Sequence, residues 1–535
     1  MFTSSIDQRL LTALADSEVP SYYRIGLEKE SLRVNPNATI ATTAHPAQLG
    51  AALTHPHITT DFSEALLELV TPAFDQIPEV LDFLEILHRF VYAQLADEQL
   101  WATSMPCVLN QGQSIPLARY GQSNAGQMKT VYRRGLGYRY GRLMQLISGI
   151  HVNFSLNEQL WPLLHSVASA EQAALSPQAF RDHRYMVMVR NLQRLGWVVP
   201  YLFGASPAIC ASFLQGESSS FAHFDAHTLY RPFATSLRMG DIGYQNRQEE
   251  GTGMKACYDS LDAYIRSLTW AIETPCPQYE SIGVKVNGQY RQLNDHVLQI
   301  ENEYYSTVRP KQLTEWMERP TLALRRRGIL YVELRSVDVN AFLPLGIDAE
   351  QLYFLATLML YCLLLPGPRI DARERRAIDA NELLAAHRGR DPELVLERRG
   401  QPIKLKQWLK ELDEDLIAVA EVLDGDTIGP HRASVVAQQC KIDDPEATPS
   451  AQMLATMRSQ GLGFAALARQ LTTQHRDYFL AQPLPAAKQQ WLEQLAAESH
   501  QRQQQIEAQD QLSFDDFLAR YFAQSESVPV DLAVI

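Results

Sequence analysis

Carboxylates spaced two or four residues apart recur in several short apolar segments of this 535-residue chain. In a β-strand, residues at this spacing project from the same face, so each segment would place its polar side chains together. The segments are 25–30 (IGLEKE), 64–70 (EALLELV), 150–154 (IHVNF), 300–303 (IENE) and 329–337 (ILYVELRSV). We therefore expect five strands with a shared polar face, to which Asp61 adds a carboxylate from just before the second strand.

The composition of this polar face favours a site for divalent cations. A sheet face exposed to water also carries carboxylates, but Lys and Thr would usually be mixed in. This set is mostly Glu, with one His, one Asn and one Arg. Hard oxygen ligands with few thiols or paired imidazoles favour Mg²⁺ or Mn²⁺ over zinc, and magnesium held by carboxylates is typical where polyphosphate is neutralised. We therefore expect Mg²⁺, with Mn²⁺ as the alternative, at a site that suits a polyphosphate.

No glycine-rich nucleotide loop accompanies these carboxylates. The chain has no GxxxxGK[ST] motif and no GxGxxG after a strand, so a nucleotide would be held by metal ions and a curved sheet. We expect an α+β fold in which a curved, mostly antiparallel sheet forms a cup-shaped active site surrounded by helices. This plan resembles the glutamine synthetase-like carboxylate–amine ligases at the level of the fold.

The elements that position these residues change in character along the chain. Short β-like runs alternate with helices up to about residue 345, and the pattern is almost wholly helical from about residue 366. We expect a catalytic core at residues 1–365 and a helical part at residues 366–535, packed on each other as one continuous domain. The apolar run 352–365 is too short to span a bilayer and predicts a buried helix.

Composition excludes several classes of function. The formal net charge is -13, and Lys and Arg do not gather into a basic stripe, which argues against nucleic acid as a partner. The six cysteines lie far apart without metal-type spacing, as expected of reduced thiols, and the N-terminus has no signal-peptide pattern. We expect a cytoplasmic monomer without membrane partners, whose cysteines are not nucleophiles.

Eight longer stretches carry a resemblance to a known family. They are GLEKESLRV (26–34), THPHITTDFSEALLELVTP (54–72), SMPC (104–107), YRYGRLMQLISGIHVNFS (138–155), PYLFGASPAICASFLQG (200–216), ATSLRMGDIGYQN (234–246), LQIENEYYSTVRPKQ (298–312) and GILYVELRSVDVNAFLPLGI (328–347). On these stretches the chain resembles the bacterial glutamate–cysteine ligase family, most strongly over residues 20–350. The resemblance implies a ligase that uses ATP as a co-substrate and joins L-glutamate and L-cysteine through a γ-glutamyl phosphate, the first step of glutathione synthesis.

The resemblance also assigns roles to single residues. The metal ligands that it implies are Glu28, Glu30, Asp61, Glu68, His151 and Glu333. It assigns Arg238 and Arg335 to the glutamate and to the transferred phosphoryl group, for which a planar, permanently charged guanidinium is suited. The cysteine substrate would lie among Tyr132, Arg133, Gln145, Tyr244 and Tyr305, with Phe62 as an addition.

Three other functions fit parts of the pattern. A related carboxylate–amine ligase would use glutamate with another amine, and a phosphohydrolase would release phosphate from ATP without any amine. A nucleotide sensor without activity would be expected to have lost ligand carboxylates, yet all of them are present. Phosphate release that depends on cysteine distinguishes the ligase from the phosphohydrolase.

Overall fold

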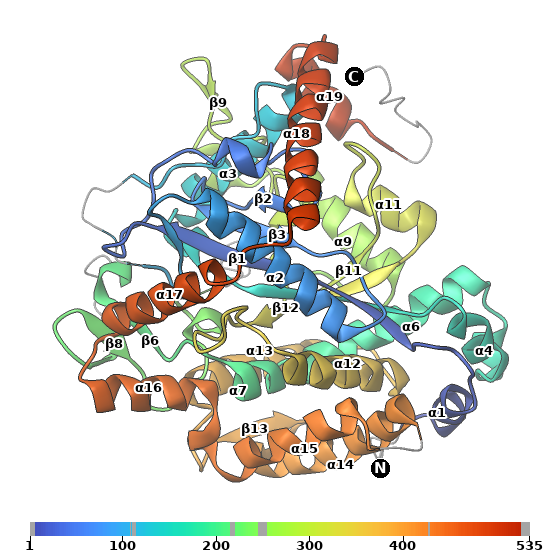
Figure 1. Ribbon diagram of the computed structural model, residues 1–535. Coiled ribbons are helices and arrows are strands. Elements are labelled where there is room, and N and C mark those ends of the chain that lie inside the picture. Colours follow the sequence, from blue (N-terminus) through green and yellow to red (C-terminus); the bar gives the residue numbers. More distant parts are fainter. Residues whose placement is uncertain are drawn as a thin grey trace.

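The computed structural model describes residues 6–107, 109, 114–214, 220–243, 254–425 and 428–525. A seven-stranded sheet lies in the middle of the molecule, and every strand pair in it is antiparallel (Figure 1). Across the sheet the strands are β11 (Val308–Lys311), β12 (Tyr331–Val337), β5 (Ile150–Leu156), β1 (Tyr23–Val34), β3 (Leu66–Val70) and β2 (Ile58–Thr60), and β4 (Gln99–Leu100) pairs with the end of β1.

The alternation of residue types gives this sheet two different faces. On β1, Ile25 and Leu27 are fully buried on one face, which we call the back, while Glu28 and Glu30 project from the front. Pairing of Leu27 with Val152 and of Leu334 with Val152 continues the apolar back face across β5 and β12. The back therefore drives packing, and the front is left for polar side chains.

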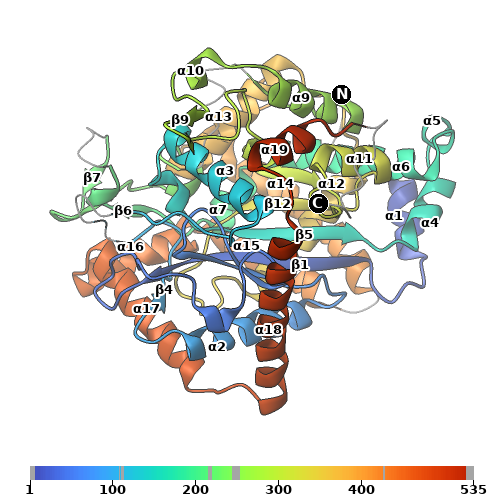
Figure 2. The same cartoon turned by 90° about the horizontal axis from the view of Figure 1, so that it is seen from above.

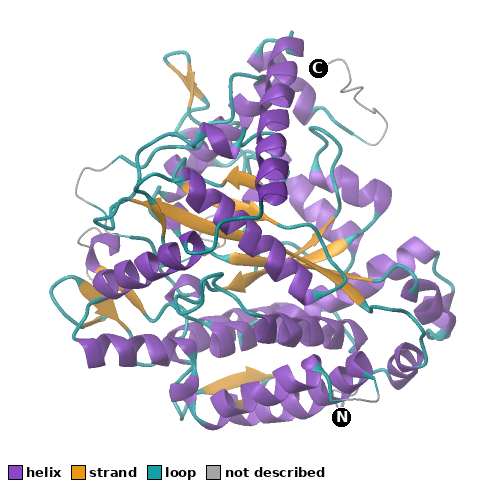
Figure 3. Cartoon of the chain, viewed as in Figure 1, coloured by secondary structure: helices purple, strands orange, loops and turns teal. Residues whose placement is uncertain are grey.

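Helices cover the back of the sheet in two layers, as Figures 1 and 3 show. The helix α12 (Ala349–Leu364) is buried along nearly its whole length and packs against α6 (Pro177–Arg194), α14 (Leu405–Asp424) and α15 (Pro430–Asp443). It ends just before Pro366, because proline cannot continue a helix. The prediction of a buried helix at 352–365 is confirmed, and no helix of the described ranges is long and apolar enough to cross a membrane.

The front of the sheet faces helices from distant parts of the chain. These are α3 (Asn124–Tyr140), α11 (Pro320–Arg327) and, from the C-terminal part, α19 (Phe514–Phe522). The preceding helix, α18 (Ala486–Gln509), packs against α2 (Ile77–Gln94) and residues 47–49. Seen from above, α19 lies beside α3 and α11 (Figure 2). α19 and α3 share a hydrophobic cluster that includes Met128, Phe517 and Tyr521. The C-terminal end is therefore part of the surroundings of the sheet's front face.

The remaining elements complete the periphery. The helices are α1 (Gln8–Ala15), α2 (Ile77–Gln94), α4 (Leu160–Ser166), α5 (Ala170–Ala173), α7 (Val198–Phe203), α9 (Leu261–Glu273), α10 (Pro277–Glu280), α13 (Ala372–Arg388), α16 (Pro449–Gln460) and α17 (Phe464–Leu480). The small strands are β6 (Ala208–Cys210), β7 (Ala222–His223), β8 (Thr228–Tyr230), β9 (Lys285–Val286), β10 (Gln289–Tyr290), β13 (Val395–Arg398) and β14 (Gln401–Lys404).

The predicted fold class is confirmed, but the prediction of a strand at residues 300–303 is wrong. Residues Glu301–Glu303 form a short 3₁₀-helix, because their carboxylates turn to buried arginines instead of joining the sheet. The second expected strand begins only at Leu66, and Glu64 before it accepts hydrogen bonds from the backbone N–H groups of His45 and Arg119. The division at residue 365 stays a prediction.

Candidate active site

A cavity of about 710 Å³ lies over the front face of the sheet. We call this cavity the cup, and we call its polar base the floor. The floor consists of side chains from β1, β3, β5 and β12: Glu28, Glu30, Glu68, His151, Glu333 and Arg335. The walls come from α3 and from residues 300–320. Four of the five segments that the sequence singled out therefore meet at the floor.

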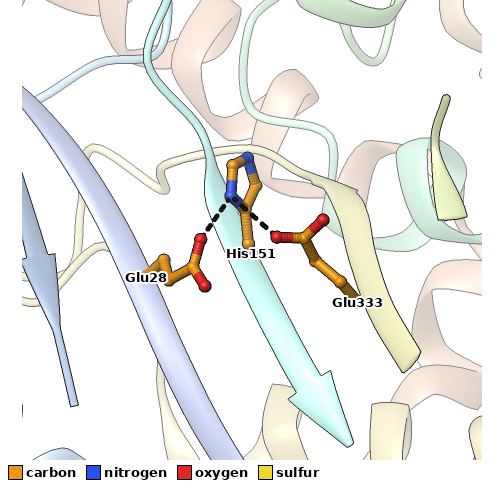
Figure 4. A group of neighbouring side chains, drawn as sticks. All are labelled: Glu28, His151 and Glu333. Carbon is orange, nitrogen blue, oxygen red and sulfur yellow. Dashed lines mark hydrogen bonds and ion pairs between the residues drawn. The ribbon is translucent and has the colours of Figure 1, made fainter. Parts of the chain in front are cut away.

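Strand register brings three of these side chains together at the centre of the floor (Figure 4). Glu28 on β1 lies opposite His151 on β5, and Glu333 on β12 lies opposite Asn153. The Nδ1 atom of His151 is 3.2 Å from Glu28 Oε2 and 4.0 Å from Glu333 Oε1. One ligand atom from each residue lies within 4.8 Å of the other two, so a single cation can contact all three.

The burial and ionisation of Glu333 support the assignment of a cation site. Its side chain is 1% exposed, and neither of its oxygens accepts a hydrogen bond, although Arg335 and Lys311 lie at ion-pair distances of 3.1 and 3.4 Å. Burial opposes ionisation, but Lys311 and Arg335 outweigh it and hold the pKa of Glu333 well below its usual value. An ionised, buried carboxylate with free lone pairs is a suitable ligand for Mg²⁺ or Mn²⁺.

Glu30 and Glu68 extend the acidic floor toward β3, where they lie opposite each other. Glu30 accepts a hydrogen bond of 2.7 Å from the backbone N–H of Gly149. Burial, and next the charge of Asp61, raise the pKa of Glu30 to about 8. Burial and the charges of Glu28, Asp61 and Glu30 raise the pKa of Glu68 well above its usual value. The floor thus carries more carboxylates than its own cations neutralise, which further divalent cations would relieve.

Asp61 follows β2 at the edge of the cup, where its side chain is 35% exposed. Arg133 lies 3.8 Å from its carboxylate and also donates to its backbone carbonyl. The six predicted metal ligands therefore all line the same cavity. Their role as ligands remains a prediction.

Cations of β11 and β12 form the positive side of the cup. Arg335 is held between Glu333 and the ring of His151, whose Nδ1 atom is 3.3 Å from the guanidinium. Arg309 and Lys311 on β11 also line the cup. The sequence reasoning missed these two residues, although their spacing of two within VRPK is the same signal that identified the carboxylates.

Arg238 lies next to the floor strand β12 but is not among the residues that line the cup. Its side chain is 1% exposed, donates a hydrogen bond of 2.7 Å to the backbone carbonyl of Arg335 and lies 3.7 Å from Asp338. A side chain at Gly149 would collide with the Arg238 guanidinium, which accounts for glycine there. In this structure Arg238 supports Arg335, and its predicted contact with glutamate stays a prediction.

The residues expected to bind cysteine divide into three groups. Tyr132 and Arg133 on α3, with Gln145 and Tyr305, line the cup as expected. Phe62 is instead a core residue, 1% exposed within a hydrophobic cluster. Tyr244 lies outside the described residues. No cysteine of the described residues lines the cup.

Two carboxylates that the sequence grouped with the floor have other partners. Glu301 accepts hydrogen bonds from Arg319 (3.2 Å) and Thr321 (2.6 Å) and does not line the cup. Glu303 reaches the wall of the cup, but Arg139 (2.8 Å) and the hydroxyl of Tyr140 (2.7 Å) bind its carboxylate. These carboxylates are neutralised by the protein itself and are therefore poor candidates for metal ligands.

Tyr521 of α19 also lines the cup, and nothing in its sequence context pointed to the site. It comes from the segment after residue 366, which was expected to contain no part of the chemistry.

Comparison with known proteins finds relatives over almost the whole chain. The model of the family described as glutamate-cysteine ligase matches residues 9–384. The glutamate–cysteine ligase of Pseudomonas paraeruginosa is 47% identical over 515 residues, which cover 96% of this chain and 97% of that protein. The glutamate–cysteine ligase of Alcanivorax borkumensis is 46% identical over 93% of this chain and 95% of that protein.

Solved structures give the same result. The glutamate–cysteine ligase of Francisella tularensis in complex with AMP superimposes with a TM-score of 0.87 at 34% identity, covering 94% of this chain and 98% of that one. A bifunctional glutathione synthetase from Pasteurella multocida shares the fold, with a TM-score of 0.69 at 24% identity over 88% of this chain and 54% of that one. The chain therefore belongs to the glutamate–cysteine ligase family.

Proposed function

We propose that the cup joins the side-chain carboxylate of glutamate to the amino group of cysteine with ATP as the energy source. Membership of the family and the likeness to a ligase solved with AMP support this activity. The observation on which the residue roles rest is the group of Glu28, His151 and Glu333 beside Arg335 on one floor. Such a site suits phosphoryl transfer, which requires positioning and neutralisation of charge more than a protein nucleophile.

In the first step, an oxygen of the glutamate side-chain carboxylate attacks the γ-phosphorus of ATP. The bond between the γ-phosphorus and its bridging oxygen breaks, and the products are γ-glutamyl phosphate and ADP. Arg335 and Lys311 line the cup and would pair with the transferred oxygens. Such donors act most strongly where negative charge accumulates in the transition state. Arg238 would fix Arg335 through the hydrogen bond to its carbonyl.

In the second step, the cysteine amine attacks the activated carbonyl carbon of γ-glutamyl phosphate. The carbon–oxygen bond to phosphate breaks, phosphate leaves, and the amine loses a proton. Tyr132, Arg133, Gln145 and Tyr305 would bind the cysteine on the wall of the cup. A cavity lined on several sides limits the access of water to the acyl phosphate, which would otherwise be hydrolysed.

Glu28, Glu30, Asp61, Glu68, His151 and Glu333 would hold the Mg²⁺ ions, with Mn²⁺ as the alternative. Magnesium supplies neutralisation of the phosphate charge of ATP when bound. The fit rests on the carboxylate oxygens of the floor, including those of Glu333, neither of which accepts a hydrogen bond.

ADP release measured with glutamate and ATP, with and without cysteine, tests this function. We expect ADP release that depends on both glutamate and cysteine. γ-Glutamylcysteine should form in an amount equal to the ADP released. Equal release without cysteine would indicate a phosphohydrolase. Release supported by another amine in preference to cysteine would indicate a related carboxylate–amine ligase.

A further inference from the structure

A C-terminal segment forms hydrogen bonds with both walls of the cup. We call residues 507–524 the strap; it comprises the end of α18, a short connection and α19. The strap lies entirely beyond residue 384, where the match to the family model ends. The match of the family model therefore assigns no role to its contacts with the cup.

The first attachment holds the beginning of α3. The carboxylate of Asp510 accepts hydrogen bonds from the backbone N–H and the side-chain amide of Asn124, the latter at 2.6 Å. The same amide donates to the Leu512 carbonyl at 2.9 Å. Asn124 is 4% exposed, so these bonds are shielded from water. A negative charge at this end of a helix also interacts favourably with the helix dipole.

Further contacts extend this attachment along the strap. Glu507 accepts a hydrogen bond of 2.8 Å from the backbone N–H of Gln122. Gly121 has a φ angle of 79°, and a side chain there would collide with the Glu507 carboxylate. Glycine at this position permits both the positive φ angle and the close approach of the strap to the loop before α3.

The second attachment holds the opposite wall. Gln524 accepts a hydrogen bond of 3.2 Å from the backbone N–H of Arg319 and donates one of 2.9 Å to the Met317 carbonyl. Between the two attachments, Tyr521 faces the cup. The strap therefore links α3 to the segment before α11 and forms part of the cup itself, an arrangement visible from above in Figure 2.

We infer that Asp510 is a positioning residue that fixes α3 so that its side chains meet the cysteine substrate. α3 bears Tyr132 and Arg133, two of the residues that line the cup on the proposed cysteine side. The inference rests on the proposed function, because it assigns this wall to cysteine. On the proposed function, ATP and its cations would contact the floor strands. Asp510 contacts α3 and not these strands, so cysteine binding should suffer more than ATP binding.

The test uses the full-length protein and compares KM values from initial rates of ADP release. For Asp510→Ala we expect the KM for cysteine to rise by about tenfold or more, the scale of small misplacements in a binding site. The KM for ATP should change less than about twofold. Asp510→Asn should give a smaller rise, because its amide oxygen still accepts one of the two bonds from Asn124.

The matched control is Asp371→Ala. Asp371 accepts hydrogen bonds of 2.8 Å from the backbone N–H groups of Arg373 and Glu374 at the start of α13, and it does not line the cup. Its loss also removes a carboxylate that accepts two hydrogen bonds at the start of a helix, but one within a single helix cap outside the cup, so every KM should stay unchanged. If Asp510→Ala fails to fold, Asp510→Asn alone decides through its rise in the KM for cysteine.

The two possible failures differ in their readout. If the wild-type protein releases ADP without dependence on cysteine, the proposed function fails and the inference fails with it. If the wild-type release depends on cysteine but the Asp510 variants keep the wild-type KM for cysteine, only the inference is overturned. A rise of equal size in the KM for ATP would also overturn it, because that result indicates general loosening of the site.

Discussion

Two pairs of glutamates with the same spacing behave in opposite ways in this molecule. Glu28 and Glu30 lie on a strand and point to a floor that carries other carboxylates. Glu301 and Glu303 lie in a 3₁₀-helix, and each is matched by a buried arginine. Spacing alone therefore does not identify a cation site.

The difference between the pairs lies in their neutralising partners. The protein supplies Arg319 for Glu301 and Arg139 for Glu303, so these carboxylates hold the fold together. On the floor, the positive charges of Arg335 and Lys311 stabilise ionised Glu333. The charges around Glu68 are mostly those of other carboxylates. A shortage of protein cations near several carboxylates favours a cation site, because external cations would neutralise the remaining charge.

The largest expected effect tests the floor. Glu333→Gln should lower turnover by roughly 1,000-fold, the upper range for loss of one electrostatic group at a reacting centre. The fold should survive because the change preserves volume, but the melting temperature should fall, since Arg335 and Lys311 lose their charged partner. Turnover and melting temperature are measured on the same preparation. Near-normal turnover would show that Glu333 is not part of the cation site.

Glu301→Gln tests the other member of the comparison. The substitution leaves the buried Arg319 without its charged partner, which should lower the free energy of unfolding by about 3 kcal/mol. Turnover per folded molecule should remain close to that of the wild type, since Glu301 does not line the cup. Denaturant unfolding and activity assays check both expectations. A loss of turnover without loss of stability would place Glu301 in the chemistry.

Arg335→Lys tests the cation beside the floor. Lysine keeps the charge but loses the planar fork, so the maximal rate should fall by about 100-fold while apparent ATP binding changes much less. Steady-state kinetics and a melting curve are needed together. A full rate with a lowered melting temperature would mean that Arg335 only holds the strand through Glu333.

The smallest effect concerns stability in the presence of ligands. Mg²⁺ together with ATP should raise the melting temperature, because a ligand at 100 times its Kd stabilises the native state by about 2.7 kcal/mol. Glu333→Gln should reduce this gain, whereas Glu301→Gln should keep it. A wild-type melting temperature that is indifferent to both ligands would contradict the cation site.

Much of the floor was predictable because strands impose a simple geometry. Alternation on β1, β5 and β12 assigns Glu28, His151 and Glu333 to one face before any tertiary contact is known. The same rule failed for Glu301 because its conformation is decided by Arg319 and Thr321, which lie 18 and 20 residues away in sequence. Tyr521 reaches the cup through helix packing, which local patterns do not encode.

The most direct test of the proposed chemistry follows one oxygen atom. Glutamate labelled with ¹⁸O in its side-chain carboxylate is incubated with ATP, cysteine and the enzyme, and the products are analysed by mass spectrometry. Attack on the γ-phosphorus predicts one ¹⁸O in each released phosphate for every γ-glutamylcysteine formed. Label in AMP would indicate an acyl adenylate, and phosphate without label would exclude the acyl phosphate; either result would contradict the account.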